Sequence, residues 1–155
     1  MELLSRGAFR TAVRWEMVRS ARYSSYFSVF SLCFGALGAA EAWIEEAALV
    51  CADCLREGDL LGRLAGARLG GLLLNADNWV APVIADRVRH RLIDHTANSG
   101  LGARLRATGG PALRITSFPS VAPDEATMLR QLDIDQWWEP DDNDGPGLAG
   151  VGARI

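Results

Sequence analysis

The stretch from Leu55 to Leu69 reads LREGDLLGRLAGARL and is the most informative part of the sequence for the fold. Two apolar runs, Gly58–Leu64 and Leu69–Leu74, lie on either side of the short segment Ala65–Arg68. Two such runs joined by a few residues that include glycine are typical of a β-hairpin. We therefore predict a β-hairpin at residues 59–74.

Helical and strand patterns alternate on both sides of this hairpin. Near the N-terminus, apolar residues such as Phe9, Val13 and Val18 recur close to helical spacing, with arginines between them. Strand–helix–strand units require crossover connections, whereas a hairpin adds an antiparallel pair. The predicted fold class is therefore α/β, with a mixed central β-sheet flanked by helices. The predicted helices are Leu3–Arg22, Ala39–Arg56, Trp79–Ile93 and Asp124–Leu132, and the predicted strands outside the hairpin are Tyr26–Phe34 and Ala112–Phe118.

The charges of the chain are unevenly distributed. All 16 basic residues are arginine, and the formal net charge of the 155 residues is −3. Residues 124–155 hold eight acids and two arginines, whereas residues 1–123 hold eleven acids and fourteen arginines. We therefore expect a domain at residues 1–132, followed at 133–155 by an acidic, glycine- and proline-rich tail or an extra strand. Arginine suits planar recognition of phosphate and guanine edges, although the absence of lysine also fits a bias in genome composition.

Composition excludes several classes of protein. No stretch approaches the ~20 apolar residues that a membrane span needs, and the N-terminus does not resemble a signal peptide. We therefore expect a cytoplasmic domain with no membrane span. Three cysteines are too few for a disulfide scaffold. Cys51 and Cys54 form a CxxC pair inside a helical pattern without a second pair of ligands, so we interpret them as core residues.

The hairpin region resembles the GGDEF domains. These are the diguanylate cyclases, which join two GTP molecules into cyclic di-GMP, together with their inactive relatives. In that family an RxxD motif precedes a five-residue signature by a short fixed spacer, as Arg56-x-x-Asp59 precedes Ala65–Leu69 here. Weaker similarities extend the resemblance over residues 4–132, and it implies a GGDEF or nucleotidyl cyclase-like fold. Those similarities lie at Leu4–Phe9, Phe27–Phe34, Arg87–Arg89 and Leu113–Pro119.

The catalytic signature of that family is not preserved in this sequence. In an active cyclase, the signature supplies glycines that let the nucleotide approach and a carboxylate that helps to hold Mg²⁺. Here the five positions read Ala65-Gly66-Ala67-Arg68-Leu69, and the metal-binding Asp that should end the first strand is replaced within Cys33-Phe34. We therefore expect no enzyme activity, no bound metal and no cofactor. Arg68 is either a solvated turn residue or a replacement for the lost metal that pairs with a nearby acid.

The resemblance implies that the RxxD motif is an inhibitory site, the I-site, which binds cyclic di-GMP away from the catalytic centre. Arg56 offers a planar fork to guanine O6 and N7 or to a phosphate, and Asp59 can accept from the N1–H and N2 amino group of guanine. Arg87 stands where members of the family carry an accessory I-site arginine. Arg91 lies one turn later on the same helix face, whereas Arg89 points elsewhere. The candidate ligand-binding residues are therefore Arg56, Asp59, Arg87 and Arg91.

These residues also have a structural interpretation. Arg56 and Asp59 could form a local salt bridge between a helix end and a strand start, and the arginines at 87, 89 and 91 could form a solvated helix face. Trp137 and Trp138 fit either an anchor for a partner or an aromatic cover over the domain's own core.

Two functions are consistent with these observations. The first is a catalytically inactive GGDEF-like domain that acts as a receptor for cyclic di-GMP through its I-site and relays the signal to a protein partner. In this case a stacked pair of ligands would bridge two domains into a ligand-induced homodimer. The alternative is a protein–protein interaction scaffold that has lost both catalysis and ligand binding. Nucleic acid is an expected partner in neither.

Overall fold

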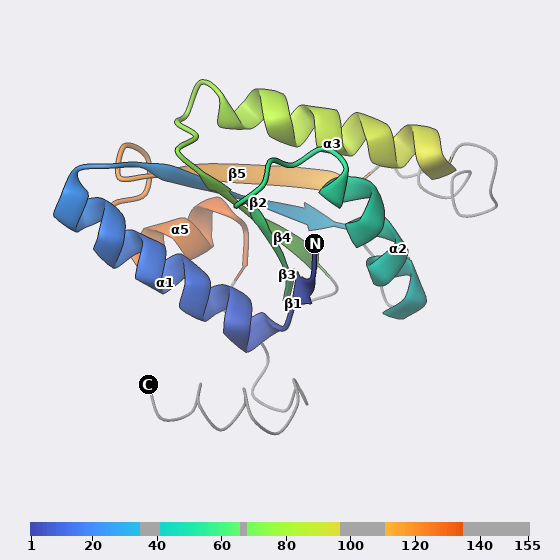
Figure 1. Ribbon diagram of the computed structural model, residues 1–155, viewed down its shortest axis with the longest axis horizontal. Helices are drawn as coiled ribbons and strands as arrows, with labels where there is room; N and C mark the ends of the chain where they lie inside the picture. The colour runs from blue at the N-terminus through green and yellow to red at the C-terminus, as the bar shows by residue number, and fades with distance from the viewer. Residues whose placement is uncertain (35–40, 66–67, 97–110, 135–155) are drawn as a thin grey trace.

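The computed structural model describes residues 1–34, 41–65, 68–96 and 111–134, in which strands form one mixed sheet with helices on both faces (Figure 1). The tail, with Trp137, Trp138 and the expected extra strand, lies outside the described residues. The strands are β1 (Leu3–Leu4), β2 (Phe27–Cys33), β3 (Leu60–Leu64), β4 (Arg68–Leu74) and β5 (Ala112–Phe118). The helices are α1 (Arg6–Tyr23), α2 (Glu41–Ala52), α3 (Ala81–Thr96) and α5 (Glu125–Gln131).

The sheet has the strand order β1-β3-β4-β2-β5. Strands β3 and β4 form the predicted antiparallel hairpin, with Leu60 opposite Leu72 and Leu64 opposite Arg68. Strand β4 also pairs antiparallel with β2, so β2 and β3 run in the same direction and are connected by the crossover that contains α2. Strand β5 is antiparallel to β2, whereas β1 is parallel to β3. The predicted mixed α/β sheet is confirmed.

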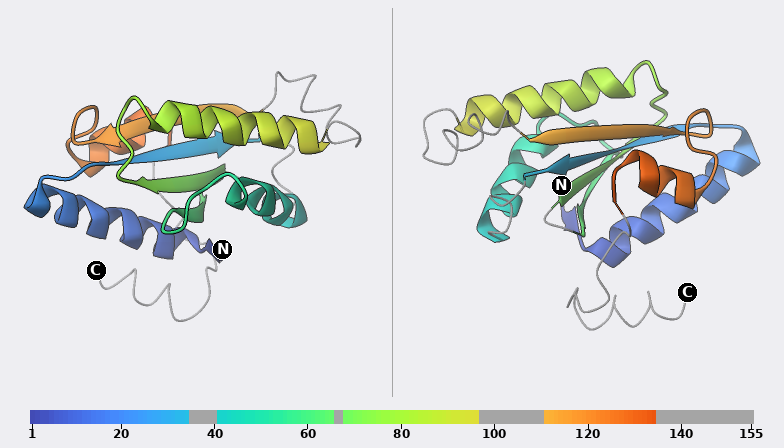
Figure 2. Two further views of the ribbon diagram at one scale, coloured as in Figure 1. Left: turned by 45° about the horizontal axis from the view of Figure 1, so that its top comes forward. Right: turned by 180° about the vertical axis from the view of Figure 1, so that it is seen from behind.

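Each face of the sheet is covered by its own pair of helices. Helices α1 and α5 lie on one face, and α2 and α3 lie on the other (Figures 1 and 2). Alternate residues of each strand point to opposite faces, so β2 contributes Phe27 and Val29 to one core and Phe30 and Leu32 to the other. The buried residues accordingly fall into two clusters, one centred on Phe9 under α1 and one centred on Phe30 under α2 and α3.

Glycines in the hairpin make room for an aromatic ring on each face. A Cβ atom added at Gly62 would overlap the side chain of Phe9, and one added at Gly71 would overlap the ring of Phe30. Both rings are fully buried. Glycine is therefore required for packing at positions 62 and 71.

Two predictions for the first helix are wrong. Leu3 and Leu4 form an edge strand beside Leu61 and Gly62, because Ser5 caps the helix: its hydroxyl accepts a hydrogen bond from Ala8 N at 3.2 Å. Val18 is 71% exposed rather than on the buried side. The buried side of α1 consists of Phe9, Val13, Glu16 and Ser20.

Two other helix boundaries differ from the prediction. Helix α2 ends at Ala52 rather than Arg56, because Cys54 N and Leu55 N donate to carbonyls only three residues back, which tightens the chain into turns. Helix α3 begins at Ala81 rather than Trp79. The amides of Trp79 and Val80 each donate a hydrogen bond to Asp77 Oδ1 at 2.9 Å. Ile134, just past the expected domain boundary, is buried in the core under α1.

None of the described helices is long and apolar enough to cross a bilayer.

Candidate functional site

Asp59 joins the loop after α2 to the end of β4. Its side chain is 2% exposed, so the carboxylate is almost fully removed from water. Oδ2 accepts a hydrogen bond from Arg56 N at 3.0 Å, and Oδ1 accepts one from Leu74 N at 3.1 Å. Because each oxygen is already bonded to a backbone amide, the carboxylate fixes this loop against the hairpin. A contact between this carboxylate and a guanine would require the loop to move.

The guanidinium group of Arg56 lies over the same strand end. Its Nη2 donates to the carbonyl of Leu74 at 2.6 Å, and its Nε lies 3.5 Å from Asp59 Oδ2. The side chain is nevertheless 52% exposed. Since an arginine has five N–H donors, the exposed edge of this group retains donors for a ligand. The predicted local salt bridge and a free donor edge therefore coexist at Arg56.

Arg87 and Arg91 lie on α3, which packs against α2. Both are exposed and are separated by one helical turn. Burial raises the pKa of the Cys54 thiol above its ordinary value, and the positive charges of Arg91 and Arg87 offset part of this rise. Both arginines therefore lie close to Cys54, which precedes Arg56 by only two residues. The four predicted ligand residues are thus distributed around the C-terminal end of α2, and of the four only Asp59 is buried.

A hollow of about 420 Å³ adjoins these arginines, where α3 passes α2. Arg91 lines it together with the acids Asp53 and Asp94. At its far side, His95 Nε2 lies 3.0 Å from Glu46 Oε1 and links the two helices. The hollow is thus mixed in charge.

Arg89 has a different function from its neighbours on α3. Its Nε donates to the carbonyl of Pro111 at 3.2 Å, immediately before β5. As expected, it points away from Arg87 and Arg91. This contact makes Arg89 a structural residue that attaches α3 to the edge of the sheet.

The closed end of the hairpin holds Arg68. This residue opens β4 opposite Leu64 of β3 and Cys33 of β2. Within the described part of the chain, Arg68 forms no ion pair with an acid, so the predicted replacement pairing finds no partner there. The same part of the chain contains no group of three or more histidine, cysteine, aspartate or glutamate residues able to hold a metal ion.

The CxxC cysteines are core residues, as predicted. Cys51 and Cys54 are both buried and both are free thiols. Burial, with a smaller contribution from Cys54, raises the pKa of Cys51 well above its ordinary value. A thiol with a raised pKa stays protonated and unreactive at neutral pH.

No protein-family model matches the chain, and no curated protein matches it in sequence. Solved structures do match it. The GGDEF domain of YfiN (TpbB) from Pseudomonas aeruginosa superposes with a TM-score of 0.68 at 20% identity, covering 85% of this chain and 86% of that one. The fold is that of a GGDEF domain. A DGC protein from Thermotoga maritima matches with a TM-score of 0.61 at 15% identity, covering 85% and 94% of the two chains. The diguanylate cyclase SiaD of Pseudomonas aeruginosa, solved in complex with its activator SiaC, matches with a TM-score of 0.65 at 20% identity, covering 84% of this chain and 52% of SiaD.

The residues at the closed end of the hairpin do not fit the magnesium site that the GGDEF resemblance implies. A divalent metal on a triphosphate requires hard oxygen ligands. Strand β2 ends in Cys33, which is followed by the buried Phe34, and β4 begins with the cation Arg68. The intervening residues Gly66 and Ala67, and the segment 35–40 (GALGAA), supply no carboxylate in the sequence. Arg68 would repel a divalent cation at this position.

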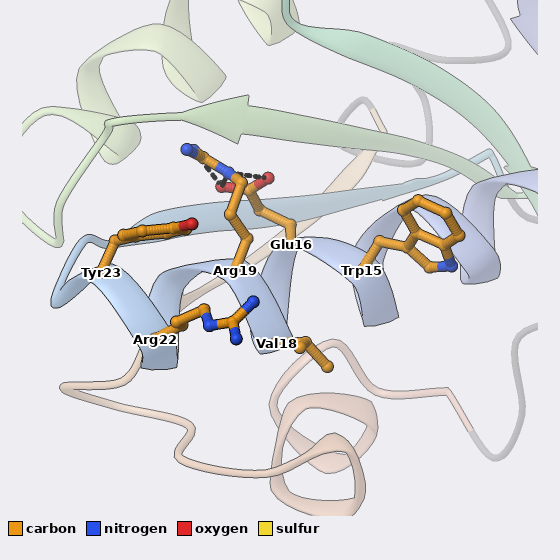
Figure 3. A pocket seen from close by; sticks show the side chains of 6 residues that line it. All are labelled: Trp15, Glu16, Val18, Arg19, Arg22 and Tyr23. Carbon is orange, nitrogen blue, oxygen red and sulfur yellow. Dashed lines mark hydrogen bonds and ion pairs between the residues drawn. The ribbon is translucent and has the colours of Figure 1, made fainter.

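The sequence analysis missed one surface feature. Trp15, Val18 and Tyr23 are exposed together along α1, around a hollow of about 400 Å³ (Figure 3). The signal was present in the sequence, because a rotation of about 100° per residue places Glu16 and Ser20 beside Phe9 and Val13 and turns Val18 outward.

Proposed function

We propose that this chain is a catalytically inactive GGDEF-like domain that binds cyclic di-GMP and passes the signal to a protein partner in the cytoplasm. The observation that carries the proposal is the position of Arg87 and Arg91. They lie on a separate helix, close enough to act electrostatically on Cys54, which precedes the half-exposed Arg56 by two residues. Cations from two segments of the chain thereby converge on one surface.

The chemistry of cyclic di-GMP suits this arrangement. Its two phosphodiesters are anions, and the O6 and N7 atoms of each guanine accept a bidentate pair of hydrogen bonds from arginine. In the proposal, Arg56 and Arg87 bind guanine and phosphate, and Arg91 adds a second cation one turn along α3. Asp59 holds the loop that presents Arg56, and its contact with the guanine N1–H edge follows if ligand binding uncovers the carboxylate.

The absence of catalysis is proposed from the closed end of the hairpin. Cyclase chemistry on GTP depends on metal ions that neutralise the triphosphate. Arg68 occupies one position of the signature, and neither Cys33 nor Phe34 supplies a hard oxygen ligand there. We therefore expect no conversion of GTP into cyclic di-GMP.

The ligand and the partner are connected by two further expectations. A stacked pair of cyclic di-GMP molecules would bridge two copies of the site and produce a ligand-induced homodimer. A protein partner is suggested by SiaD, whose structure holds its activator SiaC.

The alternative of an interaction scaffold is favoured by the state of Asp59. Its carboxylate is buried and bonded to the amides of Arg56 and Leu74, so the RxxD motif has a structural function in the absence of any ligand. A domain that had lost ligand binding would retain this function. The two proposals differ in whether the exposed edge of Arg56 is used.

Isothermal titration of the whole chain with cyclic di-GMP, with GTP as the control ligand, separates these proposals. We expect binding of cyclic di-GMP that Arg56→Ala and Arg87→Ala each weaken at least tenfold, about 1.4 kcal/mol. Arg114→Ala removes an exposed arginine from β5 and is the matched control, for which we expect unchanged affinity. No heat of binding at about 100 µM ligand would contradict the receptor function and leave the scaffold.

A further inference from the structure

The outward side of α1 carries a group of exposed large side chains together with two arginines. We refer to Trp15, Val18, Arg19, Arg22 and Tyr23 as the α1 surface. Trp15 is 75% exposed, Val18 71% and Tyr23 67%. In Figure 3, Trp15 and Tyr23 stand at the two ends of the hollow with Arg19 between them. Exposed tryptophan and tyrosine flanking an arginine is the composition found at the energetic centres of protein interfaces.

Arg19 is held in place before any partner binds. Its Nη2 lies 2.7 Å from Glu16 Oε1, and its Nε lies 3.1 Å from Oε2, so the pair is bidentate. Glu16 itself is buried and accepts a further hydrogen bond from Ser20 at 3.3 Å. Because Glu16 is held in place by burial and by Ser20, the Arg19 guanidinium is already ordered. Binding of a partner would therefore cost little side-chain conformational entropy at Arg19.

The α1 surface has an excess of positive charge. Helix α1 contains five arginines and one acid. Arg10 and Arg14 bind Glu125 of α5, and Glu16 neutralises Arg19. Arg22, in contrast, forms no ion pair with any acid of the described segments. A partner that covered this surface would leave Arg22 buried and unpaired unless it supplied a carboxylate.

We propose that the α1 surface binds an acidic segment of a second protein, with carboxylates opposite Arg22 and apolar side chains in the hollow between Trp15 and Tyr23. This surface would be the binding site for the protein partner of the proposed function, and the partner's segment would be acidic. The inference rests on the proposed function only in assuming that such a partner exists. Binding of cyclic di-GMP is not required for it, since the candidate ligand residues lie on the opposite face of the sheet.

Three other occupants fit the α1 surface less well. Pairing of α1 with α1 of a second copy would bring together two surfaces that each carry an excess of positive charge, which is repulsive. A membrane-surface helix needs its apolar face free, whereas Phe9 and Val13 of α1 are fully buried. Residues 135–155 are acidic but follow α5, which binds the flank of α1 with Arg10 and Arg14, about 80–120° around the helix from Arg22.

The test uses the whole chain and a synthetic acidic peptide in which glutamates and leucines recur at helical spacing. Isothermal titration at low salt measures its affinity, and the same peptide with lysine in place of glutamate is the control ligand. We expect only the acidic peptide to bind. Trp15→Ala and Arg22→Glu should each weaken it roughly tenfold or more. Both positions are exposed, so circular dichroism should show an unchanged fold.

Trp79→Ala is the matched control variant. Trp79 is 80% exposed, but it directly precedes α3, which covers the other face of the sheet from α1 (Figure 1), so its removal should leave the affinity for the acidic peptide unchanged. Equal losses for Trp79→Ala and Trp15→Ala, or binding of the lysine peptide, would overturn the proposal. Selective binding of a peptide with the sequence of residues 135–155 would overturn it in favour of the chain's own tail. Selective binding of phosphatidylglycerol vesicles would overturn it in favour of a membrane.

The proposed function is checked separately in the same samples. Cyclic di-GMP is titrated into the Trp15→Ala variant, which leaves Arg56 and Arg87 intact. Binding of cyclic di-GMP without any response to the acidic peptide would reject the α1 surface and retain the receptor. Peptide binding without cyclic di-GMP binding would support the α1 surface and reject the receptor.

Discussion

The two faces of the sheet use arginine in different ways. On the α1–α5 face, Arg10 and Arg14 converge on the single carboxylate of Glu125, at 3.2 and 2.7 Å, and attach α1 to α5. On the α2–α3 face, Arg87 and Arg91 are exposed, and no ion pair links either of them to an acid in the ranges that the structure describes. Arginines of the first kind hold the domain together, whereas those of the second kind do not.

The difference indicates which arginines are available for a ligand. Two like charges one helical turn apart destabilise a helix by a few tenths of a kcal/mol. Arg87 and Arg91 are such a pair on α3. Asp53 and Asp94 line the hollow beside Arg91, but no ion pair links either arginine to an acid in the described ranges. An anionic ligand that contacts both would remove the repulsion. Arg10 and Arg14 are also one turn apart, but Glu125 already compensates them.

The largest effects should come from the glycines that separate the two cores. Gly71→Ala places a methyl group into the ring of Phe30 on the α2–α3 face, and Gly62→Ala places one into Phe9 on the α1–α5 face. Neither ring can move without disturbing a close-packed core. We expect each substitution to lower the free energy of unfolding by about 3 kcal/mol, measured by urea denaturation.

Gly7→Ala is the matched control for this pair. No atom lies within 4 Å of a Cβ added at Gly7, which is in the first turn of α1. Alanine is the better helix former, so this substitution should stabilise the domain slightly, by up to about 1 kcal/mol. A loss at Gly71 and Gly62 no larger than about 0.5 kcal/mol would mean that the cores are looser than the structure indicates.

The next effect concerns the link between the loop after α2 and the hairpin. Asp59→Ala leaves the amides of Arg56 and Leu74 without their carboxylate acceptor in a buried position. Hydrogen bonds to a charged group are worth about 1.5–3 kcal/mol each, so we expect the free energy of unfolding to fall by about 3 kcal/mol.

Asp59→Asn provides the graded comparison for that substitution. The amide keeps one acceptor oxygen and should recover part of the loss. Arg68→Ala, at the closed end of the same hairpin, should change the free energy of unfolding by less than about 0.5 kcal/mol. If Asp59→Ala were as mild as Arg68→Ala, the RxxD motif would have no structural function and the scaffold alternative would lose its support.

The sequence predicted the sheet better than it predicted the helix faces. Strand β5 was located at both ends, because Ile115, Thr116 and Phe118 are residue types enriched in strands. Val18 was wrongly assigned to the buried side of α1, because the assignment considered apolar residues only. The buried side is in fact completed by two polar residues, Glu16 and Ser20. A pattern of hydrophobic residues does not predict that a charged residue such as Glu16 is buried in an ion pair.

The candidate site was predictable as a set of residues but not as a set of contacts. The RxxD spacing identified Arg56 and Asp59, and helical periodicity separated Arg89 from Arg87 and Arg91. The backbone of Leu74 as the partner of both RxxD side chains was not predictable, because that contact exists only when the hairpin closes. A pairing between residues 15 or more apart is a property of the tertiary fold.

The smallest effect on stability should distinguish the two kinds of arginine directly. The double variant Arg10→Ala/Arg14→Ala removes both partners of Glu125 and should lower the free energy of unfolding by about 1 kcal/mol, since these ion pairs are partly buried. The double variant Arg87→Ala/Arg91→Ala removes two exposed, mutually repelling charges and should leave that free energy within about 0.5 kcal/mol of the parent chain. Urea denaturation at low and high salt measures both, and salt should weaken only the effect at Arg10 and Arg14. An equal loss in the two variants would make Arg87 and Arg91 structural residues, and the convergence of cations at the end of α2 would then need no ligand to explain it.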